Sequence, residues 1–266
     1  MTNPLKDGRG YVMALAAADA AAADAAPSAP TLSLYDILGV DVFGGIPARQ
    51  VVADLQALGD VPELSVRINS PGGDVFEAIA IYNALARFPA KVTVHVDGVA
   101  ASAATLVAMA GDQVLVAENA MFMVHRPWTG VMGDAPEFRR QADVLDKAWS
   151  AMLATYARRT GRRAATFEQK VADAGGEWWM TAEEAVSEGF ADAVTKPEKE
   201  AQVFGLHRFR HVPAQLAASA AGVGVAESPT APRIAEIAPP RVEASVREVM
   251  PLAQRRRIVE ALRLAT

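Results

Sequence analysis

The sequence of 266 residues contains no cysteine. This absence excludes disulfide bonds, thiol catalysis and cysteine zinc sites, and it is typical of proteins from a reducing compartment. Long apolar runs are also missing, because no uninterrupted segment approaches the length of a membrane span. Asp7, Asp19 and Asp24 interrupt the apolar N-terminal region, which argues against a signal peptide. We therefore expect a cytoplasmic protein without a membrane partner.

An excess of basic charge is absent too. The formal net charge is −5 and the isoelectric point is about 5.5, which argues against a nucleic-acid partner over the whole surface. What the chain has in quantity is apolar residues, at 51%, enough for one sizeable core with extensions.

Composition divides the chain into three parts. Residues 1–30 form a low-complexity arm rich in alanine and aspartate, in which we interpret residues 10–15 as an edge strand. Residues 31–196 carry regular patterns and form the expected domain. Residues 197–266 are rich in Ala, Gly, Ser and Pro and carry a net charge of +3, which predicts a largely flexible extension that ends in a short amphipathic helix.

Strands and helices alternate through the middle part of the chain. This order predicts an α/β domain with a largely parallel sheet and right-handed crossovers. The long helix has an acidic start and a basic end, as the helix dipole favours. The predicted strands are 31–39, 63–70, 91–96, 113–117 and 121–125, and the predicted helices are 46–59, 74–88, 102–110, 134–159 and 165–174.

The segment around Ser102 is the centre of this pattern. Alternating valines predict a buried strand that breaks at 97–98 and leads through a tight turn into an apolar helix. A buried helix start directs free N–H groups at the space before it, which suits an oxyanion. The same residues also fit a simpler interpretation, in which Ser102 caps the helix and the small residues allow close packing.

Three other segments carry candidate chemistry. The sequence Ser-Pro-Gly-Gly-Asp at 70–74 lets the main chain approach a ligand, or forms only a strand-to-helix turn. His125 ends an apolar strand just before Arg126-Pro127, where its imidazole is either functional or structural. Asp173 closes a helix before an apolar strand and either orients an imidazole or lies on the surface.

The other histidines serve as a contrast. His95 lies mid-strand between valines and is interpreted as structural, and His207 and His211 lie in the C-terminal extension.

The four segments resemble, in order and spacing, the signature blocks of the Clp protease proteolytic-subunit family of serine peptidases. The blocks are INSPGGD, GVAASAATLVAMAG, MFMVHRP and EWWMTAEEAVSEGFAD, and the resemblance covers about residues 31–194. It is greatest to the phage and prophage branch, the head-maturation proteases. It implies the α/β Clp-protease and crotonase-like spiral of repeated β-β-α units with a protruding long helix.

The resemblance assigns roles position by position. Ser102 is the nucleophile, His125 the general base and then acid, and Asp173 the residue that orients the imidazole, although Glu177 and Asp192 are nearby carboxylates. The backbone N–H groups of Gly73 and Ala103 form the oxyanion hole. No metal and no cofactor is implied.

The resemblance also implies partners. The chain would assemble with itself into rings, commonly heptameric, and cleave proteins such as a capsid scaffold in the cytoplasm or inside the phage prohead. One alternative is a cellular proteolytic subunit that works with an ATP-driven (AAA+) unfoldase. Others are a non-catalytic assembly protein on the same fold and a crotonase-like acyl-CoA enzyme, which would not need the serine, histidine and aspartate set.

Overall fold

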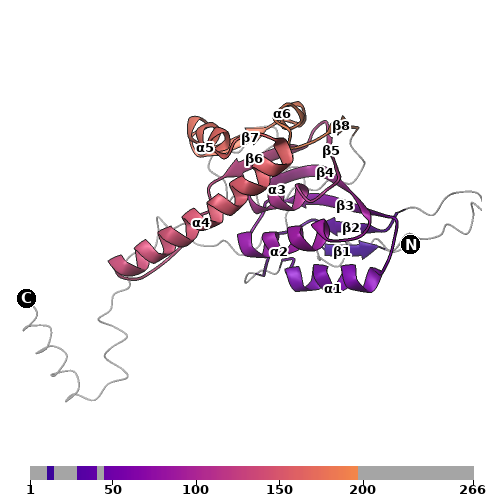
Figure 1. Cartoon of the computed structure of the whole chain (residues 1–266), viewed down its shortest axis with the longest axis horizontal. Coiled ribbons are helices and arrows are strands. Elements are labelled where there is room, and N and C mark those ends of the chain that lie inside the picture. The colour runs from indigo at the N-terminus through magenta and orange to yellow at the C-terminus, as the bar shows by residue number, and fades with distance from the viewer. Residues whose placement is uncertain (1–10, 15–28, 41–44, 197–266) are drawn as a thin grey trace, which may run out of the picture. The chain divides into compact units, whose positions relative to one another are not determined.

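The protein is described here from a computed structural model, which covers residues 11–14, 29–40 and 45–196 (Figure 1). The strands are β1 (Tyr11–Ala14), β2 (Thr31–Leu34), β3 (Glu63–Ser70), β4 (Lys91–Ala101), β5 (Gln113–Ala117), β6 (Met121–His125), β7 (Glu177–Met180) and β8 (Ala193–Thr195). The helices are α1 (Ala48–Leu58), α2 (Val75–Ala86), α3 (Ala103–Ala108), α4 (Ala135–Thr160), α5 (Ala164–Asp173) and α6 (Ala182–Glu188).

The sheet is largely parallel, as predicted. Its main path runs β1-β2-β3-β4-β5-β8, and β6 pairs with the end of β4 and with β7. Only the β1–β2 and β6–β7 pairs among the described strands are antiparallel. The predicted edge strand near the N-terminus is confirmed, because β1 pairs with β2 at the edge of this path.

One face of the sheet carries the main apolar core. The alternation in β3 and β4 buries Val66 and Val94, which share one apolar cluster with Val51 of α1 and Ile81 of α2. Figure 1 shows α1, α2 and α3 lying along this sheet. The core thereby fixes the ends of β3 and β4, next to which the candidate residues Gly73 and Ser102 lie.

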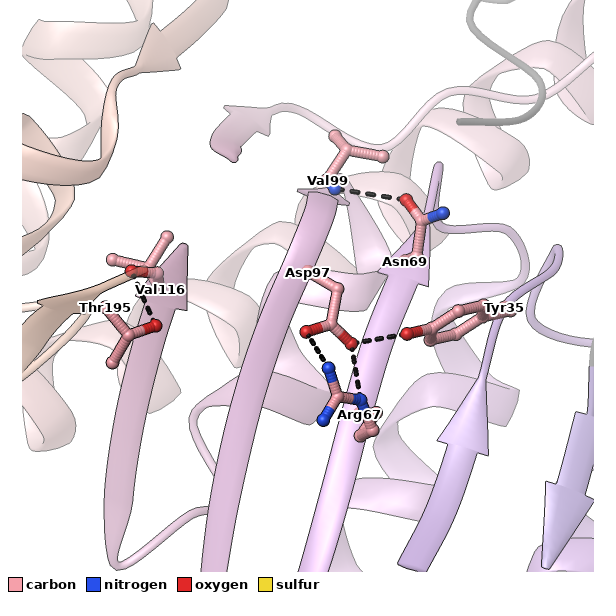
Figure 2. A network of polar contacts seen from close by, with 7 residues as sticks. All are labelled: Tyr35, Arg67, Asn69, Asp97, Val99, Val116 and Thr195. Carbon is pink, nitrogen blue, oxygen red and sulfur yellow. Dashed lines mark hydrogen bonds and ion pairs between the residues drawn. The ribbon is translucent and has the colours of Figure 1, made fainter. Parts of the chain in front are cut away.

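The opposite face of β4 holds a buried charge. Asp97 accepts hydrogen bonds from Arg67 Nε (2.9 Å) and Nη2 (2.6 Å) and from the Tyr35 hydroxyl (2.5 Å), as Figure 2 shows. The predicted break at 97–98 is therefore wrong. Because neighbouring strands satisfy the carboxylate, β4 continues to Ala101, and residues 99–101 pair with β6. The turn comes at Ser102 instead.

The long helix α4 is capped by Asp134, the residue before it, whose carboxylate accepts a hydrogen bond from the N–H of Glu137 (3.0 Å). Its first half, residues 135–147, is exposed or half-buried, and its second half is packed in the core. In Figure 1 the first half of α4 projects beyond the sheet. The sequence pattern predicted this helix nearly to its ends.

The end of the described region was only partly predicted. The segment after β7 forms α6, which begins with a capping box between Thr181 and Glu184, and then β8. The predicted C-terminal extension with its helix, together with His207 and His211, lies outside the described residues.

Candidate active site

Ser102 lies at the point where β4 gives way to α3, with an unusual backbone conformation. Its φ is 54° and its ψ is −127°, and it is the one non-glycine residue with positive φ in the described part of the chain. Its N–H donates to the carbonyl of Met123 on β6 (2.8 Å), which ties the turn to the strand that ends in His125. A strained residue of this kind persists only where its surroundings hold it, and such residues cluster at functional sites.

His125, the last residue of β6, directs its imidazole at this serine. The distance between His125 Nε2 and Ser102 Oγ is 2.6 Å, a hydrogen bond between side chains 23 positions apart in the sequence. His125 is 7% exposed. The two residues are brought together because the end of β4 pairs in parallel with β6, in the register Ala101 to Met123.

Burial lowers the pKa of the His125 imidazole from its ordinary value of 6.5, while the charge of Glu177 acts in the opposite direction. The lowered pKa favours the neutral ring near neutral pH. Only the neutral ring can accept a proton from a hydroxyl. The pair therefore has both the geometry and the protonation state that activation of a serine requires.

The glycine segment lies against the serine turn. Gly72 and Gly73 have φ values of 91° and 148°. A Cβ added to Gly72 would lie 2.8 Å from the Cβ of Ser102, and one added to Gly73 would lie 2.1 Å from the carbonyl oxygen of Leu38. The close approach explains why glycine is needed at both positions.

Two backbone amides border the space in front of the serine. Ala103 is the first residue of α3, so its N–H has no acceptor within the helix. Gly73 and Ala103 both line one cleft of about 440 Å³ together with Ser102 and His125. Apolar side chains from four regions complete its wall, among them Ile37, Phe76, Trp128, Val144 and Met152. The wall of the cleft therefore suits apolar groups of a ligand.

The predicted third residue, Asp173, lies at the end of α5 and is exposed. Its Oδ1 accepts a hydrogen bond from Gln169 Nε2 (2.7 Å) one helical turn earlier. The role of Asp173 in orienting the imidazole stays a prediction.

Glu177 is the carboxylate placed opposite the histidine. In the antiparallel β6–β7 pair, His125 and Glu177 are direct partners. Directly opposed residues place their Cβ atoms about 5 Å apart on the same face of a sheet. Glu177 is half-buried, and its charge raises the pKa of His125. Sequence reasoning noted Glu177 only as a neighbour, because the pairing of strands about 50 residues apart leaves no local signal.

Asp192, the other neighbouring carboxylate, has structural contacts. It accepts hydrogen bonds from the N–H of Val114 (2.7 Å) and from Arg159 Nη2 (2.5 Å), which hold the start of β5 and the end of α4. Within the described ranges, no cluster of three or more His, Asp or Glu side chains is placed to hold a metal ion. No helix there has both the length and the apolar character needed to cross a membrane.

The family model for Clp protease matches residues 45–198, which are more than half of the chain. The match includes every residue that lines the cleft except residues 37–40. The chain belongs to the Clp protease family. It is therefore a serine-type peptidase, and the predicted family is confirmed.

Curated relatives agree with this membership. The chain is 32% identical over 142 residues to ATP-dependent Clp protease proteolytic subunit 2 of Corynebacterium efficiens, covering 53% of this chain and 70% of the relative. It is 31% identical over 171 residues to subunit 2 of Gluconobacter oxydans (60% and 75% covered). It is 32% identical over 148 residues to subunit 1 of Corynebacterium jeikeium (55% and 77% covered).

A solved structure agrees with the fold. A point mutant of ClpP1 from Listeria monocytogenes superposes with a TM-score of 0.53 at 19% identity, over 61% of this chain and 89% of that one. The predicted Clp-protease-like α/β fold is thereby confirmed.

Proposed function

We propose that the protein is a serine endopeptidase in which Ser102 is the nucleophile and His125 the general base. The single observation that carries this proposal is the 2.6 Å hydrogen bond between Ser102 Oγ and His125 Nε2 at the floor of the cleft. A serine hydroxyl attacks an amide only when a base takes its proton, and His125 has a pKa suited to that step. The imidazolium then returns the proton to the leaving amine.

The N–H groups of Gly73 and Ala103 are the proposed oxyanion hole. Both residues line the cleft beside Ser102, and a tetrahedral intermediate needs fixed donors at the place where its negative charge develops. The positive φ of Ser102 and of Gly73 fixes how the peptide groups next to these residues are oriented, which supports this assignment. Loss of one such donor typically costs roughly a hundredfold or more in rate.

A carboxylate completes the proposed mechanism by orienting the imidazole and stabilising its charged form. Asp173 is the residue that the resemblance predicts, and Glu177 is the residue that the strand register favours. We propose Glu177 for this role, with Asp173 as the competing candidate. The two are separable by substitution, because Asp173 is an exposed residue bonded to Gln169, whereas Glu177 acts on the pKa of His125.

Self-association into rings is part of the same proposal. The projecting first half of α4 carries Phe138, which is 52% exposed, and Val144, 41% exposed. Trp128 and Met132, in the segment that precedes this helix, are 66% and 95% exposed. Exposed apolar side chains grouped in this way are typical of protein interfaces. Sedimentation velocity would test this point. A ring species in the wild type that is lost in Phe138→Asp is the expected result, and a monomeric wild type would contradict it.

For the biological role, we propose head maturation in a phage or prophage, with capsid scaffold proteins as substrates. The resemblance of the four blocks to the phage branch supports it, as does an extension of 68 residues beyond the family match. The names of the curated relatives favour a second candidate, a cellular proteolytic subunit that works with an ATP-driven unfoldase. Portal and major-capsid genes beside this gene would support the first role, and their absence the second.

Hydrolysis of a quenched fluorescent peptide library tests the activity itself. The wild type should cleave members with apolar residues at the scissile bond, and Ser102→Ala should lose at least roughly a thousandfold of that rate. Ser187→Ala is the matched control, because Ser187 is exposed on α6, and it should cleave normally. Equal cleavage by the wild type and Ser102→Ala would overturn the proposal.

A further inference from the structure

A line of hydroxyl groups runs from the core to the backbone of Ser102. Thr105 Oγ1 lies 2.6 Å from the carbonyl oxygen of Ser102 and 2.6 Å from the hydroxyl oxygen of Tyr156. Thr105 and Tyr156 are both fully buried. The carbonyl can only accept, so Thr105 uses its one hydrogen on Ser102, and the Tyr156 hydroxyl must donate to Thr105. The direction of both bonds is therefore fixed.

This line acts on the strained residue. Ser102 has positive φ, a conformation that is unfavourable in a non-glycine residue. Its N–H is held by Met123, and its carbonyl receives the N–H of Thr105 at 3.1 Å and the Thr105 hydroxyl at the shorter 2.6 Å. The Thr105 hydroxyl is thus the closest contact that fixes the peptide plane between Ser102 and Ala103. That plane orients the Ala103 N–H.

Tyr156 is in turn held rigidly. It lies on the buried half of α4, and its ring packs edge-on against Phe167 of α5 (5.9 Å between centroids) and Phe190 after α6 (5.3 Å). Burial raises the pKa of the Tyr156 hydroxyl above its ordinary value of 10, so the group remains a proton donor at every working pH. The hydroxyl donor therefore has a fixed place relative to the serine turn.

We propose that Thr105 and Tyr156 are positioning residues, which hold Ser102 and the Ala103 amide in the geometry required for attack. The inference rests on the proposed role of Ser102 as nucleophile. Neither residue touches the cleft, so their removal should lower kcat and leave KM nearly unchanged. A misplacement of about 1 Å at a reacting group can cost roughly a hundredfold in rate.

Four variants separate this role from simple core packing. Thr105→Val keeps the shape but removes both bonds, Thr105→Ser keeps the hydroxyl, and Tyr156→Phe removes only the outer donor. The double variant Thr105→Val with Tyr156→Phe tests whether the two act as one unit. Tyr82→Phe is the matched control, because the Tyr82 hydroxyl bonds Arg158 at the surface.

For each variant we would measure the second-order rate constant of labelling by a fluorophosphonate. The values of kcat and KM for a peptide substrate and the melting temperature would be measured as well. We expect Thr105→Val to react about 10- to 100-fold more slowly and Tyr156→Phe about 3- to 10-fold more slowly, through kcat. Thr105→Ser and Tyr82→Phe should stay within about twofold of the wild type. The double variant should be no slower than Thr105→Val.

Two contrary results have different meanings. If the wild type is labelled and both Thr105→Val and Tyr156→Phe are labelled at the wild-type rate, the positioning role alone is overturned. A wild type that is neither labelled nor active on peptides would overturn the proposed function, and the positioning role with it. If Thr105→Val fails to fold, Tyr156→Phe, which loses only one oxygen atom, decides the question by its kcat.

Discussion

Strand β4 contains one buried polar cluster and leads into a second polar cluster at its end, and the two are built in opposite ways. At Asp97, the carboxylate is enclosed by Arg67 and Tyr35, and each partner satisfies it from a neighbouring segment (Figure 2). At Ser102, five residues further on, the hydroxyl has His125 on one side and an open cleft on the other. The first cluster is closed and holds strands together. The second cluster leaves room for a substrate. This is the difference between a polar cluster that stabilises the fold and one that can carry out catalysis.

Among the changes to the cluster around Ser102, we expect the largest effect on activity from replacing Glu177, the carboxylate that faces the histidine. Glu177→Gln should lower kcat by roughly 10²- to 10⁴-fold, because an imidazolium would form without a charge to stabilise it. Asp173→Asn should change kcat by less than about threefold, since Asp173 is exposed and bonded to Gln169. Peptide hydrolysis by the two variants checks this. The opposite ranking would assign the role to Asp173, as the family resemblance predicts.

Removing a partner from the cluster around Asp97 should lower the stability of the fold instead of the activity. Arg67→Met leaves Asp97 buried without its cation and should lower the free energy of unfolding by about 3 kcal/mol. The side chains of Arg67 and Asp97 are only 20% and 9% exposed. Arg126→Met is the matched control, because its ion pair with Asp146 is 55% and 70% exposed and should contribute below about 1 kcal/mol. Urea unfolding measures both, and equal losses would contradict the distinction.

The stability that Arg67→Met loses should depend on pH. Burial raises the pKa of Asp97 above 3.8, and Tyr35 and Arg67 lower it, so removing Arg67 raises it further. A carboxyl group with a raised pKa in the folded state stabilises the fold most at low pH, and this contribution is lost as pH rises through the folded value. The deficit of Arg67→Met should therefore be smaller at pH 5 than at pH 8. A deficit that grows toward acid pH would contradict this sign.

The smallest expected effect is a shift in the acid limb of activity. Since burial lowers the pKa of His125 below 6.5, kcat/KM should fall only when pH drops below that value. Glu177→Gln should move the midpoint of the residual activity to still lower pH, because the charge of Glu177 raises this pKa. Profiles of kcat/KM between pH 4.5 and 8 measure both midpoints. A midpoint above 6.5 in the wild type would contradict the assignment.

The two clusters also differ in how far the sequence predicts them. The alternation in β3 predicted a strand with the observed bounds, and the INSPGGD and MFMVHRP blocks pointed to Gly73 and His125. Asp97-Gly98 was mistaken for a turn, because the partners that bury Asp97 lie 30 and 62 positions away. Thr105, Tyr156 and the pairing of Glu177 with His125 depend equally on contacts between distant elements. Local patterns carry no signal for these.

The central claim is that Ser102 is a nucleophile activated by His125. It is tested most directly by treating the full-length protein with a fluorophosphonate and mapping the modified residue by peptide mass spectrometry. We expect a single adduct on Ser102 in the wild type, none in Ser102→Ala, and labelling at least about a hundredfold slower in His125→Ala. An adduct on another serine, or labelling of the wild type that His125→Ala leaves unchanged, would contradict the claim.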